Sequence, residues 1–289
     1  MEISVIIVNY NVKYLLEKCL YSVQAALRNI PGEIIIVDNA SSDNSIEYLQ
    51  PLFPGVKFIA NPINKGFGSA CNTGFQQSSG EYILFLNPDT IVPTDCFKKC
   101  LDFIQTKKDA GALGIKMLNG SGNYLKESKR NFPSVSASLF KMTGLASLFP
   151  HSKLFAAYYA GHLSENEIHE VDVLSGAFML IKRNVFIEVK GFDEDFFMYG
   201  EDIDLSYRIQ KAGYKNYYFP ETSITHYKGA STKKRSMAHI KPFYGAMSIF
   251  VDKHYSGGAK GVFKFILKTG IWFFAGLYAI GNIFRSEQK

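Results

Sequence analysis

Two short runs of β-branched residues constrain the fold of this 289-residue chain more than any other feature. Residues 3–8 read ISVIIV and residues 33–38 read EIIIVD, and neither run shows a regular alternation of apolar and polar side chains. Such runs are typical of strands that are buried on both faces, as the strands of a parallel sheet are. Apolar residues with helical spacing occupy 12–27 between them. The pattern therefore predicts a βαβ unit in which helices cover a parallel sheet.

The same alternation of strand and helix continues along the chain. Strands are expected at 56–60 and 81–90, and residues 64–78 open a helix between them. After a variable segment at 123–168, the sequence predicts strands bent around Gly176 (171–183), a short helix (184–192), a helix that ends at Gly213, and a strand that ends at Pro220. The expected fold class is α/β with a mostly parallel central sheet, and 289 residues suffice for one large domain with an appendage.

Charge and cysteine usage narrow the class of partner. The net charge of +6 is partly concentrated in 227–235 and near the C-terminus, which suits anionic small molecules or an anionic membrane surface. The excess is too weak for a nucleic-acid-binding protein, and no nucleic-acid-binding motif is found, so no nucleic acid is expected.

The four cysteines show no CxxC spacing, which favours free thiols in a reducing compartment. No basic stretch or cleavage site accompanies the first apolar run, so no signal peptide is expected.

Polar residues follow each of the first four predicted strands. They are Asn9-Tyr10-Asn11, Asp38-Asn39, Asn61 with Asn64, and Asn87-Pro88-Asp89. Any single strand can end in such turn-forming residues. Ligands of open α/β sheets, however, bind beyond the carboxyl ends of the strands. Four neighbouring polar strand ends therefore favour a binding site.

An acidic cluster lies in a second region of the chain. Glu201, Asp202 and Asp204 follow Asp195 and the apolar run Phe196-Phe197-Met198-Tyr199. Acids favour the start of a helix, but a helix start does not require aromatic neighbours. A helix cap, a metal site and a catalytic base all fit this pattern. Asp204 and Arg208 are spaced i,i+4, so a helix-face ion pair is expected between them.

The C-terminal tail carries 16 uncharged residues between Lys268 and Arg285, fewer than the ~20 that a membrane-spanning helix needs. Basic flanks and Trp272 are typical of an interfacial helix or a short membrane anchor. A helix that packs on the domain or in an oligomer interface is the alternative. The tail is therefore compatible with membrane-surface contact and with an oligomer.

Seven motifs occur in a fixed order: SVIIVNYN, IIIVDNASSDNS, NKGFGSACNTG, FLNPDT, LSGAFMLIKR, GFDEDFFMYGEDIDLSYR and THYKGAST. Together they resemble the inverting nucleotide-sugar transferases of glycosyltransferase family 2, and most of all the rhamnosyltransferase-like branch that builds bacterial surface polysaccharides. The resemblance covers about residues 1–235. It implies a GT-A fold, a Rossmann-like nucleotide-diphospho-sugar transferase, over 1–235, and leaves 236–289 as a C-terminal helical segment.

The resemblance also implies where the nucleotide-sugar binds. Asp38 is expected to contact the nucleoside base or ribose, as acids do in dinucleotide folds, although an Asx-turn is the structural alternative. Gly66 precedes a helix, where glycine lets backbone approach a ligand and the helix N-terminus favours anions. The full expected set is Val8, Asn9, Tyr10, Asp38, Asn64, Lys65, Gly66, Asn72, Asn87, Pro88, Asp89, Ser175, Gly176 and Ala177.

By the same resemblance, Asp89 and His226 are expected to hold Mg²⁺ or Mn²⁺ on the donor diphosphate. Asn87 stands where the family's Asp-x-Asp motif has its first acid, which reduces the negative charge of such a site. Asp202 is implied as the general base, with Glu201 beside it; an N-cap is the alternative role for Asp202. The polar residues after His226 are expected either to clamp diphosphate or lipid phosphates or to form a solvated loop; they are Lys228, Ser231, Lys233 and Arg235.

The resemblance thus implies transfer of a sugar from dTDP-rhamnose, or next a UDP-hexose, to a hydroxyl of a glycan or lipid-linked acceptor. The enzyme is then expected in the cytoplasm, at the inner face of the cytoplasmic membrane. A Rossmann oxidoreductase would have GxGxxG after the first strand, which this chain lacks. A glycoside hydrolase also uses two carboxylates but has no need of Asp38 or the glycine loop. A non-catalytic nucleotide-sugar-binding protein of the same fold is the remaining alternative, and Asn87 is the residue that favours it.

Overall fold

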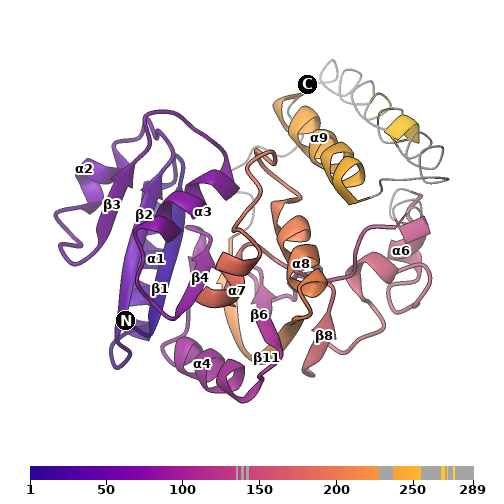
Figure 1. Ribbon diagram of the computed structural model, residues 1–289, viewed down its shortest axis with the longest axis horizontal. Coiled ribbons are helices and arrows are strands. Elements are labelled where there is room, and N and C mark those ends of the chain that lie inside the picture. The colour runs from indigo at the N-terminus through magenta and orange to yellow at the C-terminus, as the bar shows by residue number, and fades with distance from the viewer. Residues whose placement is uncertain are drawn as a thin grey trace.

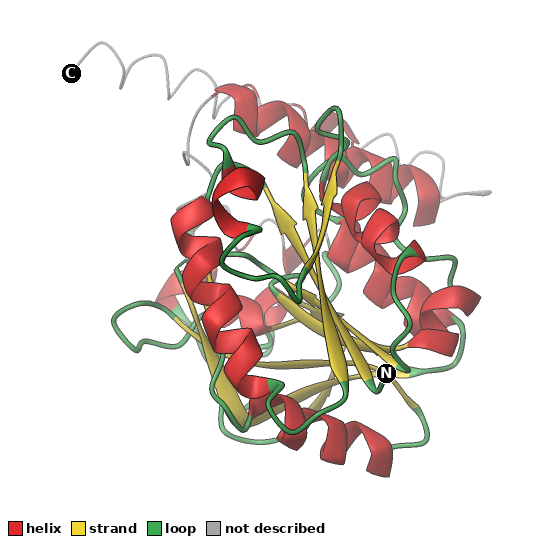
Figure 2. Cartoon of the chain, turned by 90° about the vertical axis from the view of Figure 1, so that its left-hand side faces the viewer, coloured by secondary structure: helices red, strands yellow, loops and turns green. Residues whose placement is uncertain are grey.

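The computed structural model describes residues 1–134, 136–137, 140, 143–227, 237–254, 268–270, 272 and 276. These residues form a twisted central sheet with helices on both faces (Figures 1 and 2). The sheet strands are β1 (Ile3–Asn9), β2 (Gly32–Asp38), β3 (Lys57–Ala60), β4 (Tyr82–Leu86), β5 (Thr90–Ile91), β6 (Ala110–Leu118), β8 (His169–Val171), β10 (Phe178–Lys182) and β11 (Lys215–His226). The predicted α/β GT-A-like fold class is confirmed.

The strand order is β3-β2-β1-β4-β10-β6-β11-β5, with β8 paired to β11. β1 to β4 are parallel, and β6 is parallel to β11. β10 runs antiparallel between β4 and β6 and joins the two parallel groups. A second small sheet pairs β7 (Lys129–Arg130) with β9 (Val173–Leu174).

Alternate residues of each central strand face opposite hydrophobic layers. Val5 and Ile7 pack with α1 (Lys13–Ala26), α2 (Ser45–Leu49) and α4 (Cys96–Thr106). Ile6 and Val8 pack with α3 (Phe67–Gln76), α7 (Arg183–Glu188) and α8 (Glu201–Lys211). Burial on both faces explains why the strand sequences are continuously apolar. Shorter elements are η1 (Lys126–Ser128), α6 (Leu145–Leu148) and η2 (Ala157–Tyr159).

One predicted strand end is wrong. β11 does not stop at Pro220 but continues to His226. The pairing register between β11 and β6 shifts between Phe219 and Ser223, so the proline, which has no N–H to donate, sits in the irregularity. The continuation matters because it carries His226 to the same end of the sheet as Asp89.

The loop at 192–200, which leads into α8, is held by α3 on one side. Phe67 at the start of α3 donates its backbone N–H to the carbonyl oxygen of Phe197 over 3.0 Å. Gly66 has a φ of +89°, and a Cβ built there would overlap that same carbonyl oxygen. Asn72 donates from Nδ2 to the Phe192 carbonyl and accepts at Oδ1 from the Phe192 N–H, each over 2.9 Å. α3 therefore fixes the path of this loop.

On the other side the loop and α8 are held by α9 (Met237–His254), which lies beside α8 in Figure 1. Ala246 and Phe250 of α9 pack against Phe196. Lys253 pairs with Asp193 and Asp195, and Nε2 of His254 lies 2.7 Å from Oδ1 of Asp204.

Asp204 also forms the expected i,i+4 ion pair with Arg208, over 2.7 Å. Its side chain is 1% exposed. Burial alone would raise the pKa of this carboxyl, but the hydrogen bonds from His254 and Arg208 and the charge of Arg208 lower it. The buried Asp204 carboxylate is therefore tolerated only because Arg208 and His254 face it.

In the described part of the chain, no helix has the length and apolar character that crossing a membrane requires. Most of the tail considered in the sequence analysis, and the residues Lys228, Ser231, Lys233 and Arg235, lie outside the described residues. Lys268, which is described, pairs with Asp252 of α9 over 2.8 Å. The division at 235/236 and the membrane contact of the tail stay predictions.

We expect Gly66→Ala to lower the free energy of unfolding by about 3 kcal/mol, because the methyl group meets backbone and the φ is unfavourable for any other residue. Gly55→Ala is the matched control, since nothing lies within 4 Å of its added Cβ. Urea unfolding of both variants measures the difference. Equal stabilities would contradict the close approach of Gly66 to Phe197.

We expect Asp204→Asn to cost about 3 kcal/mol of stability at neutral pH, because it leaves Arg208 and His254 without their carboxylate. A folded-state pKa below the unfolded one gives stability that is complete above about pH 4 and is lost as the pH falls further. The gap between wild type and variant, measured by urea unfolding, should therefore be constant above about pH 4 and narrow as the pH falls further. Asp102→Asn, which breaks an exposed pair with Lys98, should cost under about 0.5 kcal/mol. A gap that does not change with pH would be inconsistent with this assignment.

Candidate active site

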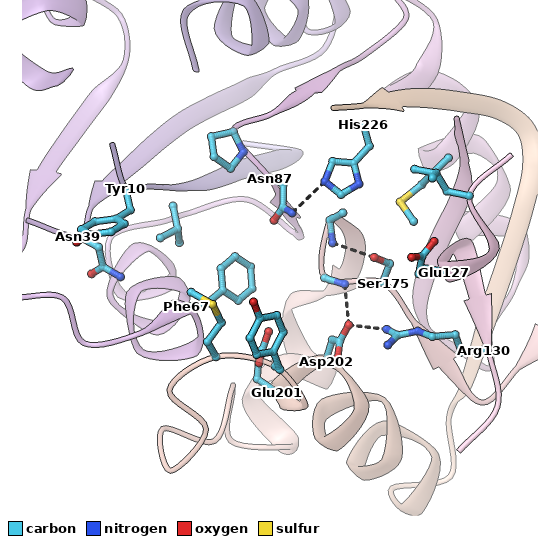
Figure 3. A pocket seen from close by; sticks show the side chains of 18 of the residues that line it. Tyr10, Asn39, Phe67, Asn87, Glu127, Arg130, Ser175, Glu201, Asp202 and His226 are labelled. Carbon is cyan, nitrogen blue, oxygen red and sulfur yellow. Dashed lines mark hydrogen bonds and ion pairs between the residues drawn. The ribbon is translucent and has the colours of Figure 1, made fainter. Parts of the chain in front are cut away.

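A cavity of about 320 Å³ opens beyond the carboxyl ends of β1 and β4, where the polar strand ends predicted a site (Figure 3). Eleven of the expected site residues line it: Val8, Tyr10, Asn64, Asn87, Pro88, Ser175, Gly176, Ala177, Glu201, Asp202 and His226. Residues that the sequence analysis did not assign to the site also line it: Asn39, Phe67, Met117, Leu125, Glu127, Arg130, Met198 and Tyr199. The expected residues Asn9, Asp38, Lys65, Gly66, Asn72 and Asp89 are not among the lining residues.

Asp38 is engaged by the protein itself. Its Oδ1 accepts a hydrogen bond from Asn9 Nδ2 over 2.7 Å, and its Oδ2 accepts one from the Ser41 N–H over 2.9 Å. The side chain is buried, and the turn that the second bond closes is the Asx-type alternative. Asn39, the next residue, lines the cavity instead; its amide is fixed by the Gly66 carbonyl and by Asn61.

Two other residues of the expected set, Asn72 and Gly66, also contact the protein itself in this structure. Asn72 binds the backbone of Phe192, and its Nδ2 lies 2.9 Å from a carboxylate oxygen of Glu194. Gly66 approaches Phe197 rather than the cavity. Lys65 is exposed. The glycine loop therefore brings α3 close to the chain's own backbone at this point.

One side of the cavity carries Asn87 and His226, and Asp89 lies behind them. The β5–β11 register pairs His226 with Thr90, and the Tyr227 N–H donates to the Asp89 carbonyl over 2.9 Å. Nε2 of His226 lies 3.2 Å from Oδ1 of Asp89 and 3.5 Å from Nδ2 of Asn87. Oδ1 of Asp89 and Nδ1 of His226 are buried and have no hydrogen-bond partner.

Unpartnered buried acceptors of this kind fit a small cation that prefers oxygen and imidazole ligands. Among the described residues, no group of three or more His, Cys, Asp or Glu side chains is arranged to hold a metal ion. Asp89 and His226 could therefore bind a divalent ion only together with ligands from a substrate, as Mg²⁺ sites built on phosphate oxygens do.

The opposite side of the cavity carries the acid pair at the start of α8. Tyr199 and Gly200 both have left-handed backbone, with φ of 69° and 84°. This turn lets α8 begin at Glu201, with Gly200 as the N-cap residue and no side-chain cap. Asp202 is therefore not the N-cap, and the alternative role considered for it is wrong.

The two carboxyl groups of this pair lie in different environments. Glu201 is 8% exposed, and its Oε2 has no hydrogen-bond partner. Burial and then the charge of Asp202 raise the pKa of Glu201 to about 8, so it is protonated at neutral pH. Asp202 Oδ2 accepts from Arg130 Nη2 over 2.5 Å and from the Gly176 N–H over 3.2 Å. A charged Asp202 beside a neutral Glu201 is the arrangement that separates acid from base roles.

Arg130 is the most significant residue that the sequence analysis missed. It lies on β7, and its Nη2 also donates to the Leu174 carbonyl over 2.8 Å. It reaches Asp202 because the register of β7 and β9 pairs Arg130 with Val173, close to Ser175 and Gly176. The segment around it carries no motif, and the charged neighbours Lys126, Glu127 and Lys129 leave nothing in the sequence that singles out this arginine.

Family profiles match most of the chain. The profile described as Glycosyl transferase family 2 matches residues 4–190, and one described as the N-terminal domain of galactosyltransferase matches 166–240. The N-acetylglucosaminyl-diphospho-decaprenol L-rhamnosyltransferase of Mycobacterium tuberculosis is 28% identical over 99% of this chain and 96% of its own length. Rhamnosyltransferase WbbL of Escherichia coli is 27% identical over 78% of this chain and 83% of its own length.

Solved structures share the fold at lower identity. A fragment of S. aureus TarS in complex with UDP-GlcNAc superimposes with a TM-score of 0.57 at 18% identity, over 94% of this chain and 72% of that one. The mannosyltransferase PcManGT from Pyrobaculum calidifontis, in complex with GDP-Man and Mn²⁺, gives 0.56 at 16% identity over 99% and 75%. The chain therefore shares its overall fold with these two solved structures.

Proposed function

The chain belongs to glycosyl transferase family 2, and on that premise we propose that it transfers a sugar, with inversion, from a nucleotide-diphospho-sugar to a hydroxyl of a lipid-linked glycan. The observation that carries this proposal is the opposition of two groups across one cavity. Asn87 and His226 lie on one side, and Asp202 lies on the other with Ser175 between them (Figure 3). A leaving diphosphate and a general base require such a separation.

The donor is proposed to lie along the cavity with its nucleoside beside Val8, Tyr10 and Asn64. dTDP-rhamnose is the first choice because two relatives that align over most of this chain are named rhamnosyltransferases. A UDP-hexose is the second choice. The neutral walls Ser175, Gly176 and Ala177 leave room for the sugar ring between the two functional sides.

Asp89 and His226 are proposed to hold a divalent ion, Mg²⁺ or Mn²⁺, whose bound charge would stabilise the departing diphosphate. The unpartnered Oδ1 of Asp89, 3.2 Å from the imidazole, supports this assignment. Asn87 offers only an amide there, so the protein contributes one carboxylate to the set. The short β5–β11 pairing keeps the two ligands in register.

Asp202 is proposed as the general base. The acceptor hydroxyl approaches the anomeric carbon from the face opposite the diphosphate, and its proton passes to the Asp202 carboxylate as the new C–O bond forms. The bond to the diphosphate oxygen breaks in the same displacement, which inverts the configuration. Phe67, Met198 and Tyr199 line the wall next to Glu201 and supply apolar surface for a sugar ring.

The acceptor is proposed to be a sugar that is linked through a diphosphate to a polyprenol. The printed name of the mycobacterial relative describes such an acceptor, and that relative aligns with 99% of this chain. Such a substrate lies in a membrane, so we place the enzyme in the cytoplasm at the inner face of the cytoplasmic membrane.

Asp202→Asn should retain donor binding and lose transfer by about 10²-fold or more, because the amide cannot take the hydroxyl proton. Turnover of dTDP-rhamnose and UDP-hexoses with a lipid-linked acceptor measures transfer, and calorimetry measures donor binding. Asp195→Asn is the matched control, an exposed acid of the same cluster that does not line the cavity. Near-normal transfer by Asp202→Asn would exclude it as the base, and donor binding without turnover by the wild type would favour the non-catalytic alternative.

Asp89→Ala should weaken nucleotide-diphosphate binding by about tenfold or more in the presence of Mg²⁺ or Mn²⁺, and should have little effect once a chelator has removed the ion. Titration calorimetry with and without the ion gives both values. Asp102→Ala, on the exposed face of α4, is the control. Wild-type transfer that a chelator leaves unchanged would show that Asp89 and His226 do not act through a metal.

A further inference from the structure

Arg130 makes contacts that go beyond filling space. Its side chain is 10% exposed, and Nη2 bridges the Leu174 carbonyl and Oδ2 of Asp202. The Gly176 N–H donates to the same carboxylate oxygen. Among the described residues, no donor reaches the other oxygen, Oδ1. Figure 3 shows the Arg130 side chain directed toward Asp202, and both residues line the cavity.

Two adjacent carboxyl groups in a buried site cannot both be ionised without a cation nearby. Asp202 has such a cation, whereas the nearly buried Oε2 of Glu201 has no hydrogen-bond partner. Without Arg130, either group could carry the shared proton, and a protonated Asp202 could not act as a base. The ion pair therefore decides which of the two acids is charged.

We propose that Arg130 is a positioning residue for the transfer step: it fixes Oδ2 of Asp202 and keeps that carboxylate ionised beside a neutral Glu201, so that Oδ1 is the atom that receives the acceptor proton. This inference rests on the proposed function of the site. The hydroxyl oxygen bonds to the anomeric carbon, its proton passes to Oδ1, and the diphosphate leaves with the electrons of the broken C–O bond. Arg130 keeps its own proton throughout.

The position of Arg130 is itself braced. Asn131, the next residue, donates from its backbone N–H to the Tyr158 carbonyl over 2.9 Å and from Nδ2 to the Ala157 carbonyl over 2.7 Å. β7 pairs with β9 on the other side. The segment around η2 thus contributes no group to the transfer but holds the arginine that faces the base. Among the described residues, the other titratable groups that line the cavity with Asp202 are Tyr10, Glu127, Arg130, Tyr199, Glu201 and His226, and Tyr158 on η2 contacts Arg130.

Arg130→Met tests the inference through the pH dependence of kcat with a saturating donor. Loss of the cation disfavours the charged form of Asp202, so the acidic limb of the profile should move to higher pH by about one unit or more. kcat at pH 7 should fall by about tenfold or more, while the donor KM changes little. Arg130→Lys keeps the positive charge but lacks the planar guanidinium with its paired N–H donors. The acidic limb of its pH profile should therefore stay closer to that of the wild type. Arg28→Met, at an exposed arginine, is the matched control.

Arg130→Met combined with Glu201→Gln separates charge from packing. Removing the second carboxylate should move the acidic limb back toward lower pH, because no neighbour then competes for ionisation. If Arg130 only fills space, the double variant should not move the acidic limb of the pH profile back. An acidic limb that stays at its wild-type position in Arg130→Met overturns the inference.

Carboxyl ¹³C NMR of the wild type gives a test that does not require turnover. Asp202, assigned by comparison with Asp202→Asn, should ionise at lower pH than Glu201. The reverse order overturns the role of Arg130 even if transfer is observed. A wild type that transfers no sugar, with the carboxyl order as expected, refutes the proposed function instead.

Discussion

The antiparallel insertion of β10 between β4 and β6 is the constraint on which the rest of the structure depends. Its register places Phe178 opposite Leu86, and the Asn87 N–H donates to the Ala177 carbonyl over 3.0 Å. The polar end of β4 is thereby fixed against the turn that precedes β10, and Gly176 in that turn binds Asp202. β10 and the turn before it thus connect the sheet of β1 to β4, whose strand ends are polar, to α8, which carries the acid pair. The strand pairing and the Asn87–Ala177 bond join backbone groups, whereas the last link, from Gly176, depends on the side chain of Asp202.

Four residues at the cavity carry buried side-chain polar atoms without hydrogen-bond partners: Arg130, Glu201 and His226, which line it, and Asp89 behind it. In the part of the chain that the structure describes, Asn9, Tyr124, Arg208 and Asn216, which do not line the cavity, carry further atoms of this kind. Native proteins leave few buried polar groups unpaired, since each costs about 1–3 kcal/mol. A fold that leaves several of them at one place is prepared to receive a polar or charged ligand there. The backbone next to the cavity is also strained. Tyr199 adopts a left-handed conformation immediately before the acid pair.

The sequence predicted the elements whose signals are local and missed those that depend on distant pairing. The buried runs of β1 and β2 are continuously apolar and the start of α8 is acidic, and each of these signals lies within a few neighbouring residues. Arg130 could not be found this way, because its role depends on a register between two-residue strands. Asp38 shows a different problem: a carboxylate at a strand end suits a ligand and also its own turn, and only the folded chain shows that Asn9 and Ser41 donate to it. Pro220 marked a true interruption, yet a register shift let the strand continue.

The strand order has a consequence for synthesis of the protein on the ribosome. β1 to β4 can pair as soon as they emerge, since their contacts are close in sequence. The second edge of β4, however, stays unpaired until residues 178–182 of β10 have been synthesised. During that interval an apolar strand edge is open to other chains. At elongation rates of about 5–20 residues per second, the interval lasts several seconds. The nascent chain thus presents β1 to β4 first, and the acid pair, His226 and α9 join them only later in translation. Chaperone demand should therefore be concentrated in this middle interval of translation.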